Sequence, residues 1–326
     1  MSPLVGVSVA RINPSRWILG SLMVCEKVDG PESKPAGSIA HWKDGDSTFY
    51  LRKRSADDPE FSAGGDSEAD RIHAAGTSAA SWCLGQDTFV KVHSWIEGVE
   101  MEAEKIRFVA EKAPEVPVPE VIYTWIDHAL DRSFLIMKRV QGQILNKAWP
   151  KLSTLQRIQI ANDVARFCVI LAANISTRLE TVTGLPVSNE RWLMDDTPES
   201  HLTWHPKFLG PLSQEALRAY LTNISTVRPP DIDPEFYFYH ADLGPTNIMV
   251  LDDGRLSGII DWESAAYYPR FWLATKPLIT WAFSLDCEKG EDSRLWAKLL
   301  SQGLETHGGL QPQEEAYDRW HDGVRR

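Results

Sequence analysis

The pattern of hydrophobic and polar positions along the first 140 residues favours strands. Residues 81–92 carry β-branched and aromatic side chains on both sides of a turn at 85–87, which predicts two short strands. Two more strands are expected at 121–126 and 134–140. A single helix is expected over 98–112, because the prolines that follow it cannot continue a helix.

After Gly142 the spacing of apolar residues becomes that of long helices. Ser153 and Gln156 have the capping-box spacing, in which each side chain bonds the backbone N–H of the other residue. A helix is therefore expected over 155–178. The apolar residues expected on its buried face are Ile158, Ala161, Val164, Ala165, Cys168, Leu171, Ala172 and Ile175.

Further helices are expected over 213–221 and in roughly the last 55 residues. The expected core of this last region comprises Trp272, Leu273, Leu278, Trp281, Phe283, Trp296, Leu299 and Leu300. A segment over 55–70 is dominated by Ser, Gly, Asp and Glu, and it is expected to be a solvated linker or loop.

Composition narrows the classes of protein that the pattern allows. The 326 residues are 43% hydrophobic, which is enough for a folded core, and the formal net charge is −11. This charge argues against a protein that binds nucleic acid by neutralising many phosphates. The apolar stretch at 17–25 is too short to cross a bilayer, and no signal-peptide core of convincing length precedes it. A cytoplasmic location without nucleic-acid or membrane partners is expected.

One segment concentrates the candidate chemistry. An apolar strand at 236–240 leads into a loop that contains Asp242, and Asn247 opens the next strand. A hairpin turn at 253–254 then returns the chain to Asp261, which brings Asp261 close to Asn247. Mg²⁺ prefers oxygen ligands such as those of carboxylates and amides, and a phosphate can occupy its remaining coordination positions. The spacing of five residues from Asp242 to Asn247 is that of the catalytic loop in kinases.

This segment resembles the aminoglycoside phosphotransferase and choline kinase family, whose members phosphorylate hydroxyl groups of small molecules. The family usually reads His-Gly-Asp-x-x-x-x-Asn and later Ile-Asp-Trp/Phe-Glu. The resemblance implies that Asp242 is the catalytic base, that Asn247 and Asp261 bind Mg²⁺, and that His240 holds the shape of the loop.

Two residues depart from the family pattern. Ala241 stands where the family usually has glycine, and this raises a question about the backbone conformation of the loop. Gly244 stands where many members have a second histidine.

The resemblance extends toward the N-terminus. Lys91 looks like the strand lysine that reaches the α and β phosphates, and a glutamate of the following helix should pair with it. Glu104 fits this role best, while Glu100 and Glu102 remain alternatives that the spacing does not separate.

Two more segments resemble nucleotide-binding parts of the family. Residues 76–80, which include Ser78, occupy the place of the loop that covers the phosphates, although they contain a single glycine. Residues 135–142 resemble the hinge that binds adenine through backbone groups, and they place Lys138 and Val140 beside the nucleotide.

The resemblance implies an α+β, bilobal protein-kinase-like fold with a strand-rich N-lobe and a mostly helical C-lobe. The expected divisions are an N-terminal extension of uncertain role (1–62), a nucleotide-binding N-lobe (63–140) and a catalytic and acceptor-binding C-lobe (141–326). The expected activity is transfer of the γ-phosphate of ATP, with Mg²⁺, to a hydroxyl of a small molecule.

A different class of function stays open beside this one. A kinase-like fold can lose phosphotransfer and serve as a ligand-binding, partner-binding or repurposed biosynthetic protein. The single glycine of residues 76–80 favours this alternative, whereas the combination of Lys91, Asp242, Asn247 and Asp261 opposes it. A protein kinase is disfavoured because no Asp-Phe-Gly or Ala-Pro-Glu segment follows Asp261.

Overall fold

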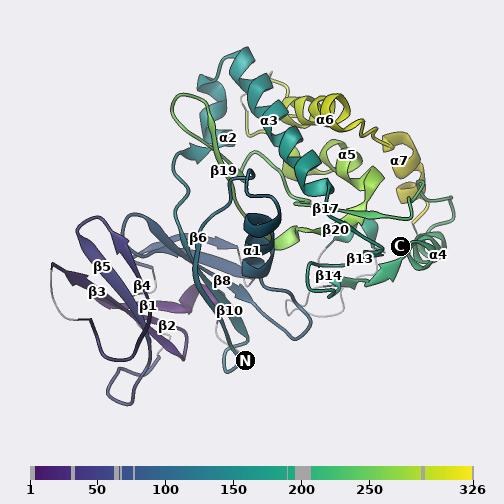
Figure 1. Cartoon of the computed structure of the whole chain (residues 1–326). Helices are drawn as coiled ribbons and strands as arrows, with labels where there is room; N and C mark the ends of the chain where they lie inside the picture. The colour runs from purple at the N-terminus through teal and green to yellow at the C-terminus, as the bar shows by residue number, and fades with distance from the viewer. Residues whose placement is uncertain are drawn as a thin grey trace. The chain divides into compact units, whose positions relative to one another are not determined.

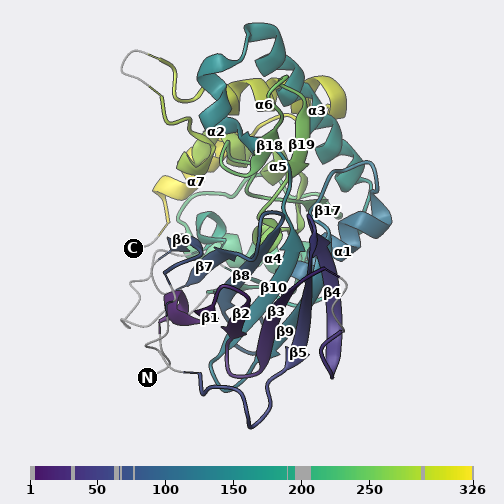
Figure 2. The same ribbon diagram turned by 90° about the vertical axis from the view of Figure 1, so that its left-hand side faces the viewer.

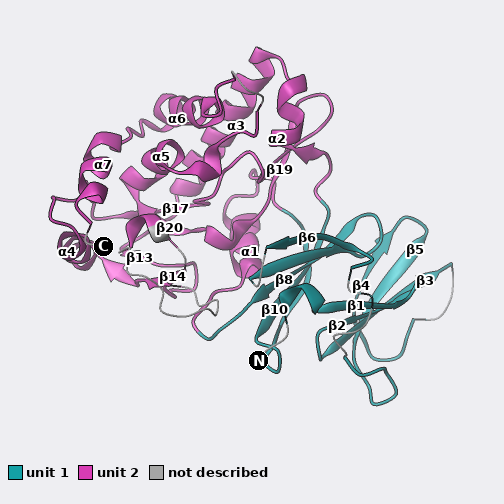
Figure 3. Cartoon of the chain, turned by 180° about the vertical axis from the view of Figure 1, so that it is seen from behind, with its two compact units in different colours: residues 1–97, 119–139 teal, residues 98–118, 140–326 magenta. Residues whose placement is uncertain are grey.

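A computed structural model describes residues 4–30, 34–61, 66, 68–75, 78–188, 190–194, 207–287 and 291–324 (Figure 1). The chain forms two compact units. Residues 1–97 and 119–139 make the first, and residues 98–118 and 140–326 make the second (Figure 3). None of the helices within the described ranges is long and apolar enough to span a lipid bilayer.

The first unit consists of two five-stranded antiparallel sheets, whose strands are seen in Figure 2. The first sheet has the order β1-β2-β3-β5-β4 and comprises β1 (Val9–Asn13), β2 (Arg16–Leu19), β3 (Met23–Asp29), β4 (Ser38–Asp44) and β5 (Ser47–Lys53), preceded by η1 (Val5–Val7). The second has the order β6-β7-β8-β10-β9 and comprises β6 (Arg71–Ala75), β7 (Ala79–Cys83), β8 (Thr88–Ser94), β9 (Val121–Asp127) and β10 (Arg132–Lys138). The strands predicted from residue 81 onward are confirmed, and β1 to β6 were not predicted.

The two sheets bury one shared hydrophobic core. Phe49 and Leu51 of β5 enter it from the first sheet, and Val90 and Val92 of β8 enter it from the second. Its remaining members are Val5, Val9, Trp17, Leu19, Met23, Cys25, Trp42, Ala80, Trp82, Leu84, Trp125, Phe134 and Ile136. Because side chains alternate along a strand, Lys91 lies on the face of the second sheet that is turned away from this core.

The expectation of a solvated linker over 55–70 is wrong at Asp58. The side chain of Asp58 is only 4% exposed, and its carboxylate pairs with Arg52 of β5 at 2.6 Å. Hydrogen bonds from the Arg52 guanidinium hold the pKa of Asp58 well below its usual range. This part of the segment therefore packs against the first sheet.

The second unit holds the helices, and its longest pair, α3 and α6, pack side by side (Figure 1). The helices are α1 (Glu102–Lys112), α2 (Leu145–Ala148), α3 (Thr154–Ala172), α4 (Gln214–Ile224), α5 (Arg270–Ile279), α6 (Leu295–Gly308) and α7 (Glu314–Asp322), with short 3-10 turns η2 (Trp149–Lys151), η3 (Arg191–Leu193), η4 (Trp262–Ser264) and η5 (Trp281–Phe283). Gly303 of α6 allows the close approach, since a Cβ there would lie 2.9 Å from the Cβ of Ala165.

Short strands complete the second unit. Two three-stranded sheets have the orders β11-β18-β19 and β12-β17-β20. Their strands are β11 (Gln143–Ile144), β18 (Ile248–Val250), β19 (Leu256–Ile259), β12 (Ile175–Ser176), β17 (Phe236–Tyr239) and β20 (Ala266–Pro269). Two strand pairs join β13 (Arg178–Leu179) to β16 (Leu212–Ser213) and β14 (Val187–Ser188) to β15 (Phe208–Leu209).

Three predictions for the helices need correction. The helix expected from residue 98 begins at Glu102, and the one expected to reach residue 178 ends at Ala172, before β12. Ile158 and Ile175 are 39% and 51% exposed, so they do not belong to the buried face of α3. The capping box of Ser153 and Gln156 is confirmed at the start of α3.

Candidate active site

The loop over 240–247 joins β17 to β18 and contains the residues predicted to carry the chemistry. The side chain of Asn247 donates from Nδ2 to the backbone oxygen of Asp242 at 2.8 Å and to its Oδ2 at 2.9 Å. The backbone N–H of Asp242 donates to Nδ1 of His240 at 3.2 Å. The ring proton of the fully buried His240 therefore sits on Nε2, which donates to the backbone oxygen of Ile260 at 3.1 Å.

The predicted hairpin brings the end of β19 beside the start of β18. Ile248 pairs with Ile259 in the antiparallel register, and the N–H of Ile260 donates to the backbone oxygen of Asn247 at 3.0 Å. Asp261 follows directly. Backbone hydrogen bonds of the hairpin and the side-chain bonds of His240 thus hold His240, Asn247 and Asp261 in one place.

Two residues of this region have left-handed backbone conformations. Ala241 has φ +65° and Asp261 has φ +66°. A left-handed alanine costs about 1–2 kcal/mol, whereas aspartate adopts this region more readily. The backbone at Ala241 therefore has the conformation that a glycine would adopt without strain. The surrounding structure imposes this conformation on the alanine.

The electrostatic environment disfavours the charged form of Asp242. Burial is the main reason that the pKa of Asp242 rises to about 6. The positive charge of Lys276 and the hydrogen bond from Asn247 lower this pKa, whereas the carboxylates of Asp261 and Glu263 raise it. A carboxylate whose pKa lies near neutrality is suited to proton transfer. The clustering of Asp242, Asp261 and Glu263 also concentrates negative charge where a cation would be stabilised.

Three segments from elsewhere in the second unit fix the loop over 240–247. The indole N–H of Trp296 donates to the backbone oxygen of Leu243 at 2.9 Å, and the N–H of Asn146 donates to that of Pro245 at 2.9 Å. At Gly244, a Cβ would lie only 2.1 Å from the backbone oxygen of Ala282 in η5. This contact explains why no side chain stands where many family members have a histidine.

The same contact places η5 against the loop that carries Asp242. Trp281, the first residue of η5, was expected in the core, but its side chain is 77% exposed. That expectation is wrong because η5 buries Phe283 instead and turns Trp281 outward. A large aromatic surface is therefore exposed one residue before Ala282, whose backbone contacts the loop over 240–247.

A buried ion pair that the sequence did not reveal lies near Asp242. Nζ of Lys276 in α5 donates to Oε2 of Glu190 at 2.6 Å, and the side chains of the two residues are 9% and 3% exposed. The charge of Lys276 acts on the carboxylate of Asp242. The two partners are 86 positions apart along the chain, so no local motif could have paired them.

The structure separates the three glutamates near the start of α1. The carboxylate of Glu100 accepts hydrogen bonds from the backbone N–H and hydroxyl of Thr183, and that of Glu104 pairs with Arg107 at 2.9 Å while 36% exposed. Glu102 is 7% exposed, and its Oε1 accepts the N–H of Trp262, next to Asp261, at 2.9 Å. Glu102 therefore contacts the residue that follows Asp261.

A second contact joins α1 to the same segment. The buried ammonium of Lys105, which is 3% exposed, donates to the backbone oxygen of Glu263. Together, Glu102 and Lys105 tie the first turn of α1 to residues 262 and 263. The position of α1 is therefore coupled to that of the chain just after Asp261.

The candidates in the first unit lie on its second sheet. Lys91 in β8 is flanked by Ser81 of β7 and Leu135 of β10. Ser78 follows β6, and its hydroxyl donates to the backbone oxygen of Ala75 at 2.9 Å. Gly76 and Thr77, which were expected in the phosphate-covering loop, lie outside the described residues.

The two hinge candidates have different surroundings. Nζ of Lys138, at the end of β10, donates to the backbone oxygen of Lys43 at 2.6 Å. Val140 belongs to the second unit, where it approaches Gly258 so closely that a Cβ on the glycine would lie 2.5 Å from its Cγ1. Val140 therefore packs on β19, the strand that leads to Asp261.

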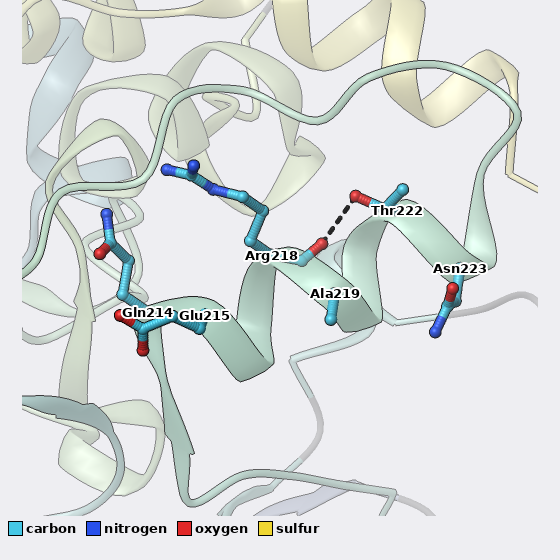
Figure 4. A pocket seen from close by; sticks show the side chains of 6 residues that line it. All are labelled: Gln214, Glu215, Arg218, Ala219, Thr222 and Asn223. Atoms are coloured by element: carbon cyan, nitrogen blue, oxygen red, sulfur yellow. Dashed lines mark hydrogen bonds between the residues drawn. The ribbon is translucent and has the colours of Figure 1, made fainter.

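A separate hollow of about 570 Å³ runs along α4 (Figure 4). It is lined by Gln214, Glu215, Arg218, Ala219, Thr222 and Asn223. The hydroxyl of Thr222 is already bonded to the backbone oxygen of Arg218 at 2.8 Å. None of the residues predicted to carry the chemistry lines this hollow.

The oxygen atoms near Asp242 are of the kind that a divalent cation bound with a phosphate requires. Across the described ranges, no group of three or more His, Cys, Asp or Glu side chains is arranged to hold a metal ion. The amide of Asn247 donates from Nδ2 to Asp242, and its Oδ1, which lies 3.4 Å from the hydroxyl of Thr246, is an oxygen that can bind a cation. One amide oxygen and one carboxylate, completed by phosphate oxygens and water, fit Mg²⁺.

An aspartate bonded to an asparagine five residues later, with a second aspartate across a hairpin, is the arrangement expected for the active site of a phosphotransferase. Residues 65–272 match the model of the phosphotransferase enzyme family, and the chain belongs to this family. The strand-rich first unit and the mostly helical second unit have the α+β, protein-kinase-like fold of its members, as predicted.

Solved structures of aminoglycoside phosphotransferases are similar to the chain at low identity. An aminoglycoside-3'-phosphotransferase of type VIII is 20% identical over 77% of this chain and 91% of its own, with a TM-score of 0.47. The GDP complex of aminoglycoside 2'-phosphotransferase-IIIa is 19% identical over 77% and 80%, with a TM-score of 0.44. The enzyme APH(3'')-Id from Streptomyces rimosus is 15% identical over 77% and 90%, with a TM-score of 0.44. A search of curated protein sequences finds no match.

Proposed function

We propose that the protein transfers the γ-phosphate of ATP, bound with Mg²⁺, to a hydroxyl group of a small molecule. The observation that carries this proposal is the arrangement of Asp242, Asn247 and Asp261. The carboxylate of Asp242 is bonded to Asn247, its pKa is raised toward neutrality, and the hairpin brings Asp261 beside Asn247.

Asp242 is the proposed general base. It accepts the proton of the acceptor hydroxyl while the hydroxyl oxygen forms a bond to the γ-phosphorus. The bond from the γ-phosphorus to the β–γ bridging oxygen breaks at the same time, and ADP is the leaving group. Oδ1 of Asn247 and the carboxylate of Asp261 would hold Mg²⁺, which neutralises charge on the β- and γ-phosphates. His240 keeps the loop in shape by bonding the chain at Asp242 and Ile260.

Nucleotide contacts are proposed for the residues that the family resemblance points to. Lys91 would contact the α- and β-phosphates, Ser78 would lie near the phosphate-covering loop, and the backbone between Lys138 and Val140 would bind adenine. For the glutamate of the nucleotide site we propose Glu102 in place of Glu104. Its support is that Glu104 is half-buried and paired with Arg107, whereas Glu102 is buried against the residue after Asp261.

The acceptor is proposed to lie against Trp281. An indole that is 77% exposed beside the catalytic loop offers a flat surface for a ring-bearing alcohol. Trp281→Ala should therefore raise the KM for a ring-bearing acceptor at least tenfold while it leaves the KM for ATP within twofold. Trp281→Phe should recover most of the loss, because it restores an aromatic face.

The test of the proposed function is ³²P transfer from γ-labelled ATP to a panel of ring-bearing and acyclic alcohols, with and without Mg²⁺. Label should appear on at least one alcohol, only with Mg²⁺, and Asp242→Asn should lower the transfer rate at least a thousandfold. The matched control is Asp253→Asn, an exposed aspartate in the hairpin turn between β18 and β19.

Two outcomes would separate the proposal from its alternative. Nucleotide binding without transfer to any alcohol would favour a kinase-like protein that has lost phosphotransfer. Equal transfer by the wild type and Asp242→Asn would show that another residue is the base.

A further inference from the structure

The N-terminal sheet lies outside the family match, which begins at residue 65, and its role is not explained by the proposed function. We propose that Asp44, at the end of β4, is a positioning residue for nucleotide binding, because it fixes the β7–β8 turn that in turn holds the hinge at the end of β10. This inference rests on the proposed function for the location of the nucleotide.

Asp44 bonds the β7–β8 turn directly. Its side chain accepts, on Oδ2, the backbone N–H of Gln86 at 2.7 Å and that of Asp87 at 2.9 Å. Asp44 is 7% exposed, so these bonds are shielded from water. A carboxylate that accepts two backbone N–H groups forms charge-assisted bonds, which are stronger than neutral ones.

Gly85 shows how closely Asp44 fits this turn. Its φ is +82°, and a Cβ at this position would lie 2.2 Å from Oδ2 of Asp44. Both the backbone conformation and the space therefore require glycine here. The turn between β7 and β8 is shaped to receive a carboxylate from the N-terminal sheet.

The same turn holds the hinge. The backbone oxygen of Asp87 accepts the N–H of Arg139 at 2.8 Å, and that of Gln86 accepts Nη1 of Arg139 at 3.3 Å. A second link reaches the hinge from the residue before Asp44, since Lys138 donates from Nζ to the backbone oxygen of Lys43 at 2.6 Å. Two adjacent residues of the N-terminal sheet thus restrain two adjacent residues of the hinge.

This restraint matters because the hinge is proposed to bind adenine through backbone groups. Such groups must be held within about 0.5 Å of their binding geometry by the contacts around them. Without Asp44, the N–H groups of Gln86 and Asp87 lose their acceptor, and the turn that bonds Arg139 is released. The expected loss is in nucleotide affinity rather than in the rate of phosphate transfer.

Asp70 is a matched control, because it joins the same two sheets at a different place. Asp70 accepts Nε1–H of Trp17 at 2.7 Å and Nη1–H of Arg11 at 3.3 Å, so it also joins the N-terminal sheet to the second sheet. It precedes β6, which is separated from β10 by β7 and β8 in the sheet order. Removing Asp70 weakens the junction of the sheets without touching the hinge.

The experiment compares Asp44→Ala and Asp70→Ala in the full chain. Binding of the N-methylanthraniloyl derivative of ADP with Mg²⁺ is measured by fluorescence, and the melting temperature of each variant is measured in parallel. Asp44→Ala should weaken binding 5- to 30-fold and Asp70→Ala less than twofold, although both lower the melting temperature. Asp44→Asn, which keeps one acceptor oxygen, should give an intermediate loss and replaces Asp44→Ala if that variant does not fold.

Two results would overturn the inference. The first is that the Asp44 variants bind the nucleotide within twofold of the wild type. The second is an equal loss of affinity for Asp70→Ala, because any damage to the junction of the two sheets would then have the same effect. Failure of the wild type to bind the nucleotide would instead reject the proposed function, and the inference with it.

Discussion

At the scale of single residues, Asp242 combines a role in the proposed chemistry with a cost to the fold. Its pKa is about 6, above its ordinary value of 3.8, chiefly because it is buried. The folded state therefore binds the proton more tightly than the unfolded state does. The resulting destabilisation is complete above pH 6 and disappears as the pH falls through 3.8.

Asp242→Asn should consequently stabilise the protein while it abolishes transfer. The side chain keeps its size and an acceptor for Asn247, and the charge near Asp261 and Glu263 is removed. The free energy of unfolding at pH 7.5, without Mg²⁺ or nucleotide, should rise by about 1–3 kcal/mol. Denaturant unfolding at pH 7.5 and pH 4.5 checks this, because the gain should shrink at the lower pH. A variant less stable than the wild type at pH 7.5 would contradict the assignment.

The buried pair of Lys276 and Glu190 makes a second prediction at this scale. Lys276→Met leaves the carboxylate of Glu190 buried without its cation and should cost about 3–5 kcal/mol of unfolding free energy. Adding Glu190→Gln should recover much of this loss. A double-mutant cycle by denaturant unfolding measures the coupling, and additive losses would show that the two side chains do not interact.

At the scale of elements, η5 and the loop over 240–247 are in direct contact. Gly244→Ala places a Cβ against the backbone oxygen of Ala282, which cannot move aside as a flexible side chain could. The variant should lose about 1–3 kcal/mol of stability and at least tenfold in turnover, because the loop carrying Asp242 must shift. Asp252→Ala, at an exposed position in the hairpin turn between β18 and β19, should change neither quantity appreciably. Equal behaviour of the two variants in unfolding and turnover assays would contradict this account.

The sequence predicted elements that depend on neighbours along the chain. The capping box of α3, the hairpin of β18 and β19, and the turn between β7 and β8 are each encoded within a few residues, and each is confirmed. The end of α3 was misplaced because Ile175 continues the apolar spacing, although its backbone pairs with β17. Trp281 was assigned to the core because hydrophobicity alone does not show which way a short turn faces.

Within the site, the motif located the loop residues but not the contacts that hold them. Asp242, Asn247 and Asp261 were identified by spacing, and the structure brings them together. The partner of Lys276 and the role of Gly244 depend on segments far apart along the chain. The choice among Glu100, Glu102 and Glu104 likewise depended on Thr183, Arg107 and Trp262, none of which the spacing could supply.

At the scale of the whole molecule, the N-terminal sheet is part of the core of the first unit. Trp17, Trp42 and Phe49 pack in the same cluster as Val90 and Phe134 of the second sheet. The sequence did not reveal this, because the strands of the first sheet have mixed burial and no motif. The division into an extension, a nucleotide-binding lobe and a catalytic lobe stays a prediction.

Deletion of residues 1–62 should therefore prevent the first unit from folding. The inner face of the second sheet would be exposed to water, including Trp82 and Trp125, and burial of each large side chain is worth about 1.5–3 kcal/mol. The truncated chain should aggregate or lack a cooperative thermal transition for this unit. A truncated chain that is monomeric and melts at the wild-type temperature would contradict the shared core.

The central claim is that Asp242, Asn247 and Asp261 form an Mg²⁺-dependent phosphotransfer site. Its most direct test is calorimetric titration of ATP into the wild type and into Asp261→Asn, each with and without Mg²⁺. The wild type should bind ATP at least tenfold more tightly with Mg²⁺ than without, and Asp261→Asn should lose this difference. Wild-type binding that does not respond to Mg²⁺, or a full Mg²⁺ response in Asp261→Asn, would contradict the account.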